Sequence, residues 1–379
     1  MATALVMELH LLASFLLLCW ANKAPLVTLS STIALGSWGN QSIPVCQWRG
    51  VTCGTRGNRR GRVVAIDLAG LSLSGTIASS LGNLTYLRQL DLRVKSFHGT
   101  LPPELGRLAQ LELLNLSSNS IGGEIPPALA SCVRLQVVSL RRNNLQGVIP
   151  SAIGNLSDLR VVDLKYNTLK GSIPKELTSL RNLEVLILGH NNLTGDIPIE
   201  IGNLKGLVFL HLRQNLLTGE IPTEIGNLTG LTELYLGLNS LTGPVPPSLG
   251  GLQKLQILYL DYCQLSGPIP SSIGNLSFLT VIDVQLNGLT GNIPESLGNL
   301  NLLNVLSLTS NNLTGPIPQV LGNLYSLTEF FLNGNDLEGN RLTGTLPPEV
   351  GDLVNLARLD ISGNRISGLI PERRGNWDE

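Results

Sequence analysis

The sequence predicts one elongated solenoid whose coils contribute strands to a parallel β-sheet. The segment NNLTGDIPIEIGNL at residues 191–204 recurs as NNLTGPIPQVLGNL at residues 311–324, an offset of 120 residues, or five periods of 24. Fragments of the same phrase recur at nearly every multiple of 24 between these two segments. A short fixed period of this kind is typical of solenoids, in which each coil contacts only its neighbours.

The array contains about 13 repeats of 24 residues, each reading approximately L-x-x-L-x-L-x-x-N-x-L-x-G-x-I-P-x-x-L-G-N-L. The L-x-L core alternates with period two, as a short strand with one buried face requires. Stacking such strands at a fixed period predicts a parallel sheet. The apolar anchors before the asparagine are spaced by 24 except for a last interval of 29: Leu68, Leu92, Leu116, Leu140, Leu164, Leu188, Leu212, Leu236, Leu260, Val284, Leu308, Leu332 and Ile361.

Three positions of the repeat explain how the chain turns after each strand. Asparagine three residues past the anchor, as at Asn311 and Asn335, turns inward and satisfies backbone groups that the turn leaves unpaired; Cys263 fills this position once. Glycine seven residues past the anchor, from Gly75 through Gly368, fits a backbone that turns with positive φ. The proline of I-P falls on the outer side, where its missing N–H interrupts no central ladder.

The N-terminus has the features of a secretory signal peptide. Residues 11–21 form an apolar run that ends near small residues, and we expect residues 1–21 to be removed. The segment before this run has no Lys or Arg, only Glu8 and His10, which leaves a short signal-anchor as the alternative. No later segment approaches the ~20 apolar residues of a membrane span. We therefore expect a secreted product.

The charge balance and the positions of the cysteines restrict the kinds of partner and site that the chain is expected to have. The chain has 26 Lys and Arg against 27 Asp and Glu, so no large field favours nucleic acid or an anionic membrane surface. Cys46 and Cys53, close together just before the array, predict a disulfide in an oxidising compartment. Cys132 and Cys263 are expected to be structural thiols, because no second close Cys or His pair supports a zinc site.

The sequence gives no support to catalysis. It has no G-x-x-x-x-G-K-[ST] loop and no ordered set of kinase motifs. His190 and His211 are expected on neighbouring strands, where an exposed polar surface explains them better than acid–base chemistry. Residues 55–62, TRGNRRGR, form one basic cluster, and their place before the first coil favours a solvated loop over an anion site. We predict neither a metal nor a cofactor.

From about Trp38 to Pro371 the chain resembles plant extracellular leucine-rich-repeat proteins, especially the ectodomains of grass leucine-rich-repeat receptor kinases of the immune-receptor type. LTGxIPxxLGNL is the plant-specific form of the repeat, and SWGNQSIPVCQWRGVTC resembles the cysteine-paired N-terminal cap, with Trp38 and Trp48 as its aromatic core. The resemblance implies an α/β-type solenoid, a right-handed superhelix whose concave parallel sheet binds peptides or partner proteins. The expected domains are a signal peptide at 1–21, a cap at 22–62, the array at 63–371 and a tail at 372–379.

Three features depart from that family. The segment ANKAPLVTLSSTIALGSW is too short and too poor in charge to supply the acidic amphipathic helix of the cap, so we expect an incomplete cap. NDLEG is followed at once by NRLTG, a five-residue duplication that must bulge outward or break the asparagine ladder locally. The sequence ends at LIPERRGNWDE without the closing cysteine pair, transmembrane helix or kinase domain, which we interpret as a truncation.

The candidate binding face consists of side chains that point out of the sheet between the two buried strand leucines. Coils six to nine concentrate aromatic residues and an arginine there, as protein-binding centres do, with Asp261 expected to be exposed beside them. Packing preference for strand surfaces is the alternative explanation. Arg141, Arg142 and Lys165 form a neighbouring basic strip that suits an acidic segment or a carboxylate terminus. The predicted ligand-binding residues are Ile187, Phe209, His211, Arg213, Tyr235, Tyr259, Tyr262, Arg141 and Lys165.

Eight N-x-[ST] sequons predict N-glycosylation of a secreted protein. Asn83, Asn155, Asn227 and Asn275 share one phase on the outer side, whereas Asn115 lies in the binding column of the third coil. A glycan on Asn115 would leave coils six to nine open to a partner. The sequons are Asn40, Asn83, Asn115, Asn155, Asn192, Asn227, Asn275 and Asn312.

These observations favour an extracellular recognition module that binds a peptide or protein partner, either a ligand or a co-receptor. The resemblance places it in plant defence or developmental signalling. It would reside in the apoplast, or at the outer face of the plasma membrane if the full gene product carries a transmembrane segment. The alternatives are a secreted inhibitor of a microbial cell-wall hydrolase and a receptor fragment without function.

Overall fold

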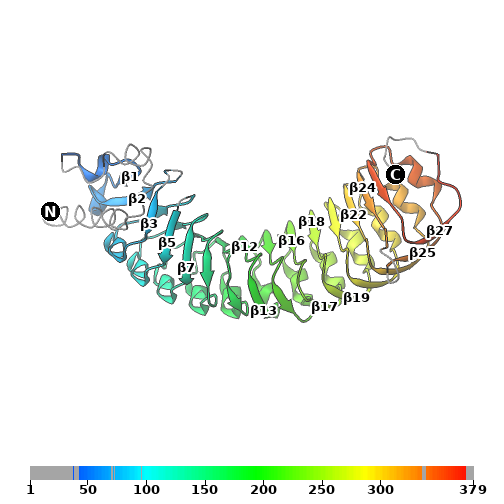
Figure 1. Cartoon of the computed structure of the whole chain (residues 1–379), viewed down its shortest axis with the longest axis horizontal. Helices are drawn as coiled ribbons and strands as arrows, with labels where there is room; N and C mark the ends of the chain where they lie inside the picture. Colours follow the sequence, from blue (N-terminus) through cyan, green and yellow to red (C-terminus); the bar gives the residue numbers. More distant parts are fainter. Residues whose placement is uncertain are drawn as a thin grey trace. The chain divides into compact units, whose positions relative to one another are not determined.

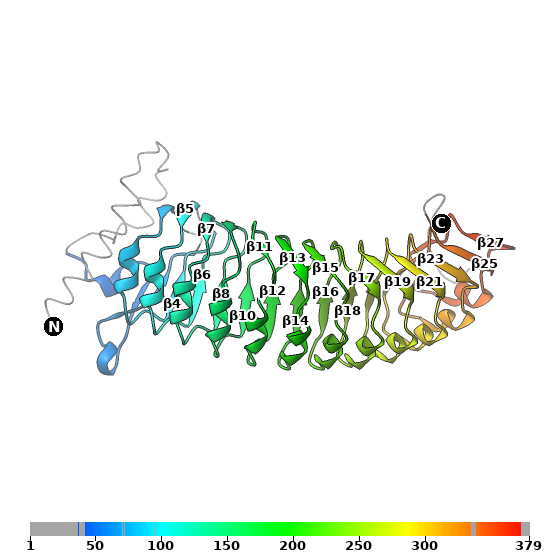
Figure 2. The same cartoon turned by 90° about the horizontal axis from the view of Figure 1, so that it is seen from below.

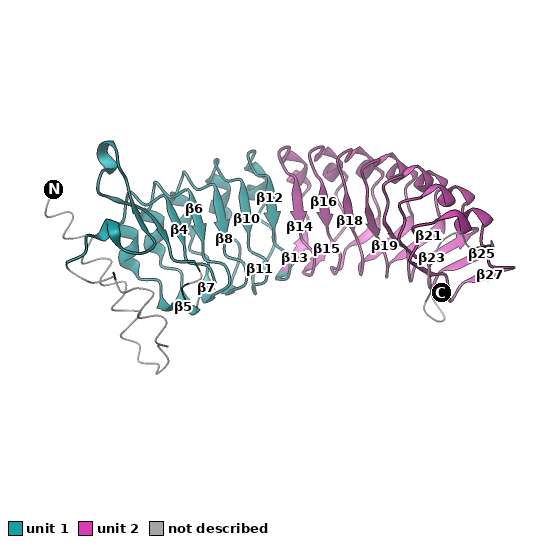
Figure 3. Ribbon diagram, turned by 90° about the horizontal axis from the view of Figure 1, so that it is seen from above, with its two compact units in different colours: residues 1–192 teal, residues 193–379 magenta. Residues whose placement is uncertain are grey.

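The computed structural model describes residue 37 and residues 42–69, 71, 73–94, 96–334 and 339–372 (Figure 1). The predicted signal peptide, Trp38, the sequon at Asn40 and residues 373–379 lie outside the described residues. The chain forms two compact units, residues 1–192 and residues 193–379, which Figure 3 colours separately. Each unit is a stack of coils that repeat the same elements in the same order.

Unit 1 has a main sheet to which each coil contributes one short strand (Figure 2). Neighbouring coils pair in parallel at an offset of 24 residues, as Leu114 pairs with Val138 and Val162 with Leu186. The first strand is the exception, because it pairs antiparallel with the second. The strands in sheet order are β1 (Val51–Cys53), β2 (Val63–Asp67), β4 (Gln89–Asp91), β6 (Leu113–Asn115), β8 (Val137–Ser139), β10 (Val161–Asp163) and β12 (Val185–Ile187).

Unit 2 repeats this arrangement. Its main strands pair in parallel in the predicted 24-residue register until Phe330 pairs with Leu359, where the offset is 29. In β16 and β18 the middle residue is buried and the flanking ones are partly accessible, as the predicted alternation requires, whereas the last residue of β14, β20 and β22 is buried as well. The strands in sheet order are β14 (Phe209–His211), β16 (Glu233–Tyr235), β18 (Ile257–Tyr259), β20 (Val281–Asp283), β22 (Val305–Ser307), β24 (Glu329–Phe331) and β26 (Arg358–Asp360).

A second row of short strands, which the repeat pattern did not predict, forms around the glycine of each repeat. Gly195 pairs with Leu217 and Gly243 with Leu265, so the backbone after each asparagine turn is also hydrogen-bonded between coils. These strands are β3 (Ser74–Thr76), β5 (Ser96–Thr100), β7 (Ser120–Glu124), β9 (Asn144–Gln146), β11 (Lys170–Gly171), β13 (Asn192–Asp196), β15 (Leu216–Thr218), β17 (Thr242–Pro244), β19 (Gln264–Pro268), β21 (Gly288–Asn292), β23 (Asn312–Gly315), β25 (Arg341–Thr345) and β27 (Arg365–Ser367).

Every helix in the described ranges is a short 3₁₀ helix, and none is long and apolar enough to cross a membrane. Those of the repeats usually begin after the proline of I-P, such as Pro198, whose φ of −61° suits a helix start. They are η1 (Val45–Gln47), η2 (Gly57–Arg59), η3 (Ser79–Asn83), η4 (Pro103–Arg107), η5 (Pro127–Ser131), η6 (Ser151–Asn155), η7 (Lys175–Ser179), η8 (Ile199–Asn203), η9 (Thr223–Asn227), η10 (Pro247–Gly251), η11 (Ser271–Asn275), η12 (Glu295–Asn299), η13 (Gln319–Asn323) and η14 (Pro348–Asp352).

The asparagine ladder forms as predicted. The side-chain amide of Asn167 donates to the carbonyl oxygens of Leu140 and Leu164, at 3.0 Å each, and its oxygen accepts from the Leu145 amide at 3.0 Å. One side chain therefore satisfies backbone groups of two successive coils. Cys263 occupies the same slot, where its thiol points at the Leu236 carbonyl oxygen 3.9 Å away.

The duplication after Leu332 leaves the ladder intact. Asn340, not the predicted Asn335, occupies the slot and is 3% exposed. Its amide donates to Leu308 and Leu332 at 2.8 and 3.0 Å, and its oxygen accepts from the Leu313 amide at 3.2 Å. The second copy of the duplicated motif supplies the buried asparagine, so the array accommodates the five additional residues without an orphaned backbone group at this position.

We expect Asn311→Ala to lower the free energy of unfolding by about 1–3 kcal/mol, because it orphans buried backbone groups. Asn311 is fully buried, donates to Val284 and Leu308 and accepts from Leu289. Cys263→Asn is the matched control, since it inserts an asparagine into a slot that a cysteine occupies and should leave stability equal or higher. Urea unfolding measures both, and equal destabilisation by the two changes would contradict the ladder.

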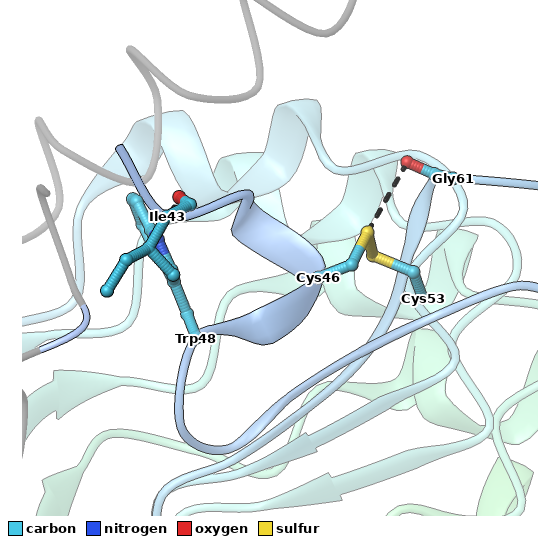
Figure 4. Close-up of a disulfide and its surroundings, with 5 residues drawn as sticks. All are labelled: Ile43, Cys46, Trp48, Cys53 and Gly61. Carbon is cyan, nitrogen blue, oxygen red and sulfur yellow. Dashed lines mark hydrogen bonds between the residues drawn. A yellow bond between two sulfur atoms is a disulfide. The ribbon is translucent and has the colours of Figure 1, made fainter. Parts of the chain in front are cut away.

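The N-terminal cap contains the predicted disulfide between Cys46 and Cys53 (Figure 4). Cys46 Sγ lies 3.9 Å from the Gly61 carbonyl oxygen. Trp48 is buried, and its indole N–H donates to the Ile43 carbonyl at 3.0 Å. The described part of the cap is therefore closed by one covalent link and one buried aromatic ring.

The two remaining cysteines of the described array are buried free thiols, as the sequence predicted. The Cys132 thiol donates to the Leu105 carbonyl at 3.3 Å. Burial raises the pKa of both Cys132 and Cys263 to about 11. They are therefore protonated at neutral pH and lack the thiolate that reactive cysteines need.

Candidate functional site

The predicted aromatic residues of unit 2 form one continuous row on the main sheet, which we call the aromatic row: Phe209, His211, Tyr235 and Tyr259. The ring centroids of Phe209 and Tyr235 lie 5.5 Å apart, and those of Tyr235 and Tyr259 lie 5.2 Å apart. Such separations are favourable for ring pairs. Tyr235 and Tyr259 are register partners on β16 and β18, so the strand pairing itself brings these rings together.

His211 and Asp261 are buried, which corrects the expectation from the sequence that both are exposed. His211 is 6% exposed, because Tyr235 stacks beside it at 5.0 Å and Phe209 lies two residues before it on the same face. Asp261 is 0% exposed. The histidine belongs to the packed base of the aromatic row, whereas Asp261 lies beneath an arginine.

Arg213 and Asp261 form an ion pair that spans two coils. Arg213 Nη2 donates to Asp261 Oδ2 at 2.5 Å, and the arginine side chain is 29% exposed. The coil between them carries Gly237 at the corresponding position, and a Cβ there would lie 2.0 Å from Asp261 Oδ1. The glycine therefore makes the pair sterically possible. The sequence alone could have indicated this ion pair, because Arg213, Gly237 and Asp261 occupy the same position in three successive repeats.

The same arginine links the ion pair to the aromatic row. The Arg213 guanidinium carbon lies 5.5 Å from the centroid of Tyr259. A guanidinium over an aromatic face contributes roughly 0.5–1 kcal/mol where solvent still reaches it. Ring, cation and buried carboxylate therefore hold one another in place, and the face of the row is preorganised.

Burial shifts the pKa values of ionisable groups in and beside the aromatic row. Burial and the Glu233 carboxylate raise the pKa of Tyr235, whose hydroxyl donates to Glu233 Oε2 at 2.7 Å. Burial also raises the pKa of Asp261 and of Asp283, while Arg213 lowers both. The phenols remain neutral donors at neutral pH, so the row offers apolar ring faces with hydrogen-bonding edges.

Tyr262 and Ile187 do not belong to the aromatic row. Tyr262 is an exposed residue in the turn after β18, with φ of 51°. Ile187 is a half-buried residue of β12 in unit 1. His190 was expected on a strand but lies in the turn that follows β12, with φ of 55°. The second residue after the anchor adopts this left-handed backbone in ten successive coils, from Val94 to Ser310, which the repeat pattern alone did not indicate.

The predicted basic strip of unit 1 gathers around a ring that was not among the predicted site residues. The charged groups of Arg141, Arg142 and Lys165 lie 5.6, 5.3 and 5.1 Å from the Tyr166 centroid. The His190 ring packs against the same ring in a tilted arrangement, with the centroids 4.1 Å apart. We call these five residues the cationic cluster. Because Tyr166 follows its anchor by two residues, it lay outside the column from which the binding face was predicted.

The sequons differ in how accessible their asparagines are. Asn83, Asn155, Asn227 and Asn275 are exposed at the ends of η3, η6, η9 and η11, and Asn192 and Asn312 are exposed at the starts of β13 and β23. Asn115 is half-buried; its amide nitrogen contacts Asp91 at 3.4 Å and its oxygen accepts from Ser117 at 2.8 Å. A glycan on Asn115 would have to replace these contacts, so this sequon is the least suited of the described ones.

The repeated strand, turn and 3₁₀ helix, stacked at 24 residues and closed by an asparagine ladder, define a leucine-rich-repeat protein, and the chain belongs to that family. Residues 122–264 match the family described as "Leucine-rich repeat region", and residues 23–54 match "Leucine rich repeat N-terminal domain". Single units described as "Leucine Rich Repeat" match at 110–132, 254–276, 278–300, 302–324 and 355–377.

Within the family, the chain is homologous to ectodomains of plant receptor-like kinases. It is 52% identical over 58 residues to the LRR receptor-like serine/threonine-protein kinase EFR of Arabidopsis thaliana, covering 15% of this chain and 5% of EFR. The structure of PEPR1–AtPEP1 matches with a TM-score of 0.86 and 34% identity over 96% of this chain and 49% of that chain.

The Arabidopsis receptor kinase HAESA, solved as its ectodomain in complex with an IDA peptide hormone ligand, matches with a TM-score of 0.80 and 34% identity over 96% of this chain and 59% of that chain. The chain thus spans about half the length of these solved ectodomains and a small fraction of the curated kinase. Its fold is that of these leucine-rich-repeat ectodomains.

Proposed function

We propose that this protein is an extracellular recognition module that binds a peptide or protein partner on the exposed face of its main sheet. The observation that carries this proposal is the aromatic row, in which Phe209, Tyr235 and Tyr259 pack side by side next to the Arg213–Asp261 ion pair. Aromatic rings packed beside a partly buried arginine are the kind of anchor that dominates protein interfaces. Aromatic rings also lose little conformational entropy on binding.

The geometry favours an extended peptide over a small metabolite. The row runs across three neighbouring strands, β14, β16 and β18, and strand spacing of ~4.8 Å makes it roughly 10 Å wide. An extended chain advances ~3.3 Å per residue, so about three residues would cross the row itself. Tyr235 and Tyr259 offer hydroxyl edges to such a backbone, and their faces would pack against its side chains.

The cationic cluster of unit 1 supplies a second contact chemistry. Arg141, Arg142 and Lys165 surround Tyr166, and no acidic side chain pairs with Arg142 among the described residues. We assign to this cluster the recognition of an acidic segment or a carboxylate terminus of the partner. Arginine suits this role because its planar fork matches a carboxylate.

The biological setting proposed for this module follows from its relatives. EFR is a receptor-like kinase, and HAESA was solved with a peptide hormone. We infer an extracellular location in a plant, with a ligand or co-receptor as the partner, in defence or developmental signalling. The predicted signal peptide, the disulfide and the exposed sequons agree with this setting.

Selection from a displayed peptide library tests this function and does not require that the ligand be identified first. The secreted full chain, with glycans trimmed enzymatically, should enrich peptides that bind its main sheet, and each enriched peptide should be retested by calorimetry. The matched counter-target is the chain carrying Tyr235→Ala and Tyr259→Ala. Enrichment that is equal on both targets would refute the proposed binding face.

A further inference from the structure

A hollow of about 570 Å³ opens in unit 1 beside the N-terminal cap, and its lining shares no residue with the cationic cluster. The lining consists of Arg59, Thr85, Tyr86, Arg88, Gln110 and Arg134. The volume lies within the range of ligand sites, roughly 300–1,000 Å³. Each of the six lining residues carries a hydrogen-bond donor, and none is aliphatic.

The repeat itself builds most of this hollow. Tyr86, Gln110 and Arg134 are spaced by 24 residues and occupy the same place, the turn between the 3₁₀ helix and the main strand, in three successive coils. Arg59 comes from η2, in the basic segment TRGNRRGR between β1 and β2. The fold thus brings this segment, which its sequence alone predicted to be a solvated loop, against arginines of the array.

The charge of the hollow is positive and only partly neutralised. Arg88 donates to Glu112 through Nε at 2.8 Å, so one arginine has an acidic partner. Arg59 and Arg134 have none in the part of the chain that the structure describes. Residues 39–66 of the sequence contain five arginines and no Asp or Glu, so the cap adds no opposing charge.

We propose that this hollow, the cap pocket, binds the acidic groups of an anionic oligosaccharide. Guanidinium groups match carboxylate and sulfate oxygens with paired hydrogen bonds. The hydroxyls of Thr85 and Tyr86 and the amide of Gln110 suit neighbouring sugar hydroxyls. An acidic peptide fits less well, because peptide recognition relies on apolar anchors and the lining has no aliphatic wall. The one aromatic ring of the lining, Tyr86, already has the Arg62 guanidinium over it, 5.6 Å from the ring centroid.

The test measures binding of the full chain to three probes of similar charge: an oligogalacturonate, which carries carboxylates, a heparin-derived oligosaccharide, which carries sulfates, and a polyglutamate peptide. Asn83→Gln is included in every variant, because Thr85 completes the sequon of Asn83 and a glycan would lie at the rim of the pocket. We expect binding of at least one saccharide at about 0.15 M salt and weaker binding as salt rises. The tighter saccharide identifies the acidic group.

Arg59→Gln with Arg134→Gln should lower saccharide affinity about tenfold or more, since each change removes a charge-assisted hydrogen bond. Both residues are exposed, so folding should be unaffected. The matched control is Arg181→Gln with Arg341→Gln, which removes two exposed arginines elsewhere and should change affinity by less than about twofold. Equal losses in both pairs, no saccharide binding by the parent chain, or polyglutamate binding as tight as saccharide binding would each overturn the proposal.

Discussion

Tyr235→Ala with Tyr259→Ala is expected to abolish measurable binding of the partner peptide, while secretion is unchanged. The two rings are stacked at 5.2 Å and are only partly buried, so their faces are available to a partner. Truncating an anchor residue of an interface typically costs about 2 kcal/mol or more, and two anchors together reduce affinity by roughly a thousandfold. Calorimetric titration of an enriched peptide against both chains measures the loss.

The control for this pair is Tyr325→Ala, because Tyr325 is an exposed tyrosine of unit 2 that lies before β24, outside the aromatic row. It should leave affinity unchanged. Retained affinity in the Tyr235 and Tyr259 double variant, with an intact circular dichroism spectrum, would remove the aromatic row from the binding face. Loss of secretion would instead show that the rings serve folding.

Arg213→Met is expected to lower the free energy of unfolding by about 3–5 kcal/mol at pH 7, because it leaves Asp261 buried without its partner. Asp261 is 0% exposed and its Oδ2 accepts from Arg213 at 2.5 Å. Methionine keeps the apolar length that covers Tyr259. Arg358→Met is the control: Arg358 pairs with Glu329 but its side chain is 62% exposed, so the loss should stay below about 1 kcal/mol.

The sign of the pH dependence of the Arg213→Met stability deficit shows whether the deficit comes from the lost ion pair or from lost packing. Burial raises the pKa of Asp261 above 3.8, and Arg213 opposes this rise, so the variant raises the pKa further. An acid with a raised folded pKa loses stability as pH increases from its unfolded pKa through its folded pKa. The deficit of Arg213→Met should therefore be largest at neutral pH and shrink as the pH falls toward about 3.8 and below.

Urea unfolding followed by circular dichroism at neutral pH and at about pH 4 measures this difference. Arg213→Met with Asp261→Leu should recover most of the stability at pH 7, since an apolar pair replaces a buried ion pair at little cost. A deficit that is the same at both pH values, or a double variant as unstable as the single one, would contradict the uncompensated charge.

Much of the site could be predicted from sequence because it depends on the repeat phase. Tyr235 and Tyr259 are one period apart, so a sheet in register places them side by side whatever the details of packing. Burial could not be predicted, since it depends on side-chain size across neighbouring coils. His211 is buried because Tyr235 stacks on it, and Asp261 is buried because Arg213 crosses the gap that Gly237 leaves.

The cationic cluster and the cap pocket show a second limit on what the repeat pattern of the sequence can predict. Tyr166 lies in a left-handed turn position, with φ of 59°, that the alternation of strand residues does not reveal. Arg59 and Arg134 are 75 positions apart in the sequence and meet around one hollow only because the loop between β1 and β2 lies against the turns of the first coils. Contacts between a loop and the array do not follow the period.

The amino-acid sequence by itself determined the coil, its 24-residue register, the asparagine ladder and the disulfide, because each follows from local spacing. For all but the disulfide, most of the repeats restate that spacing. Tertiary structure alone decided which copy of the duplicated motif enters the ladder, which polar side chains are buried, and which arginines converge. The physical reason is that register is a one-dimensional property of a repeating chain, whereas burial and charge pairing depend on the volumes and partners that neighbouring coils bring to the same place.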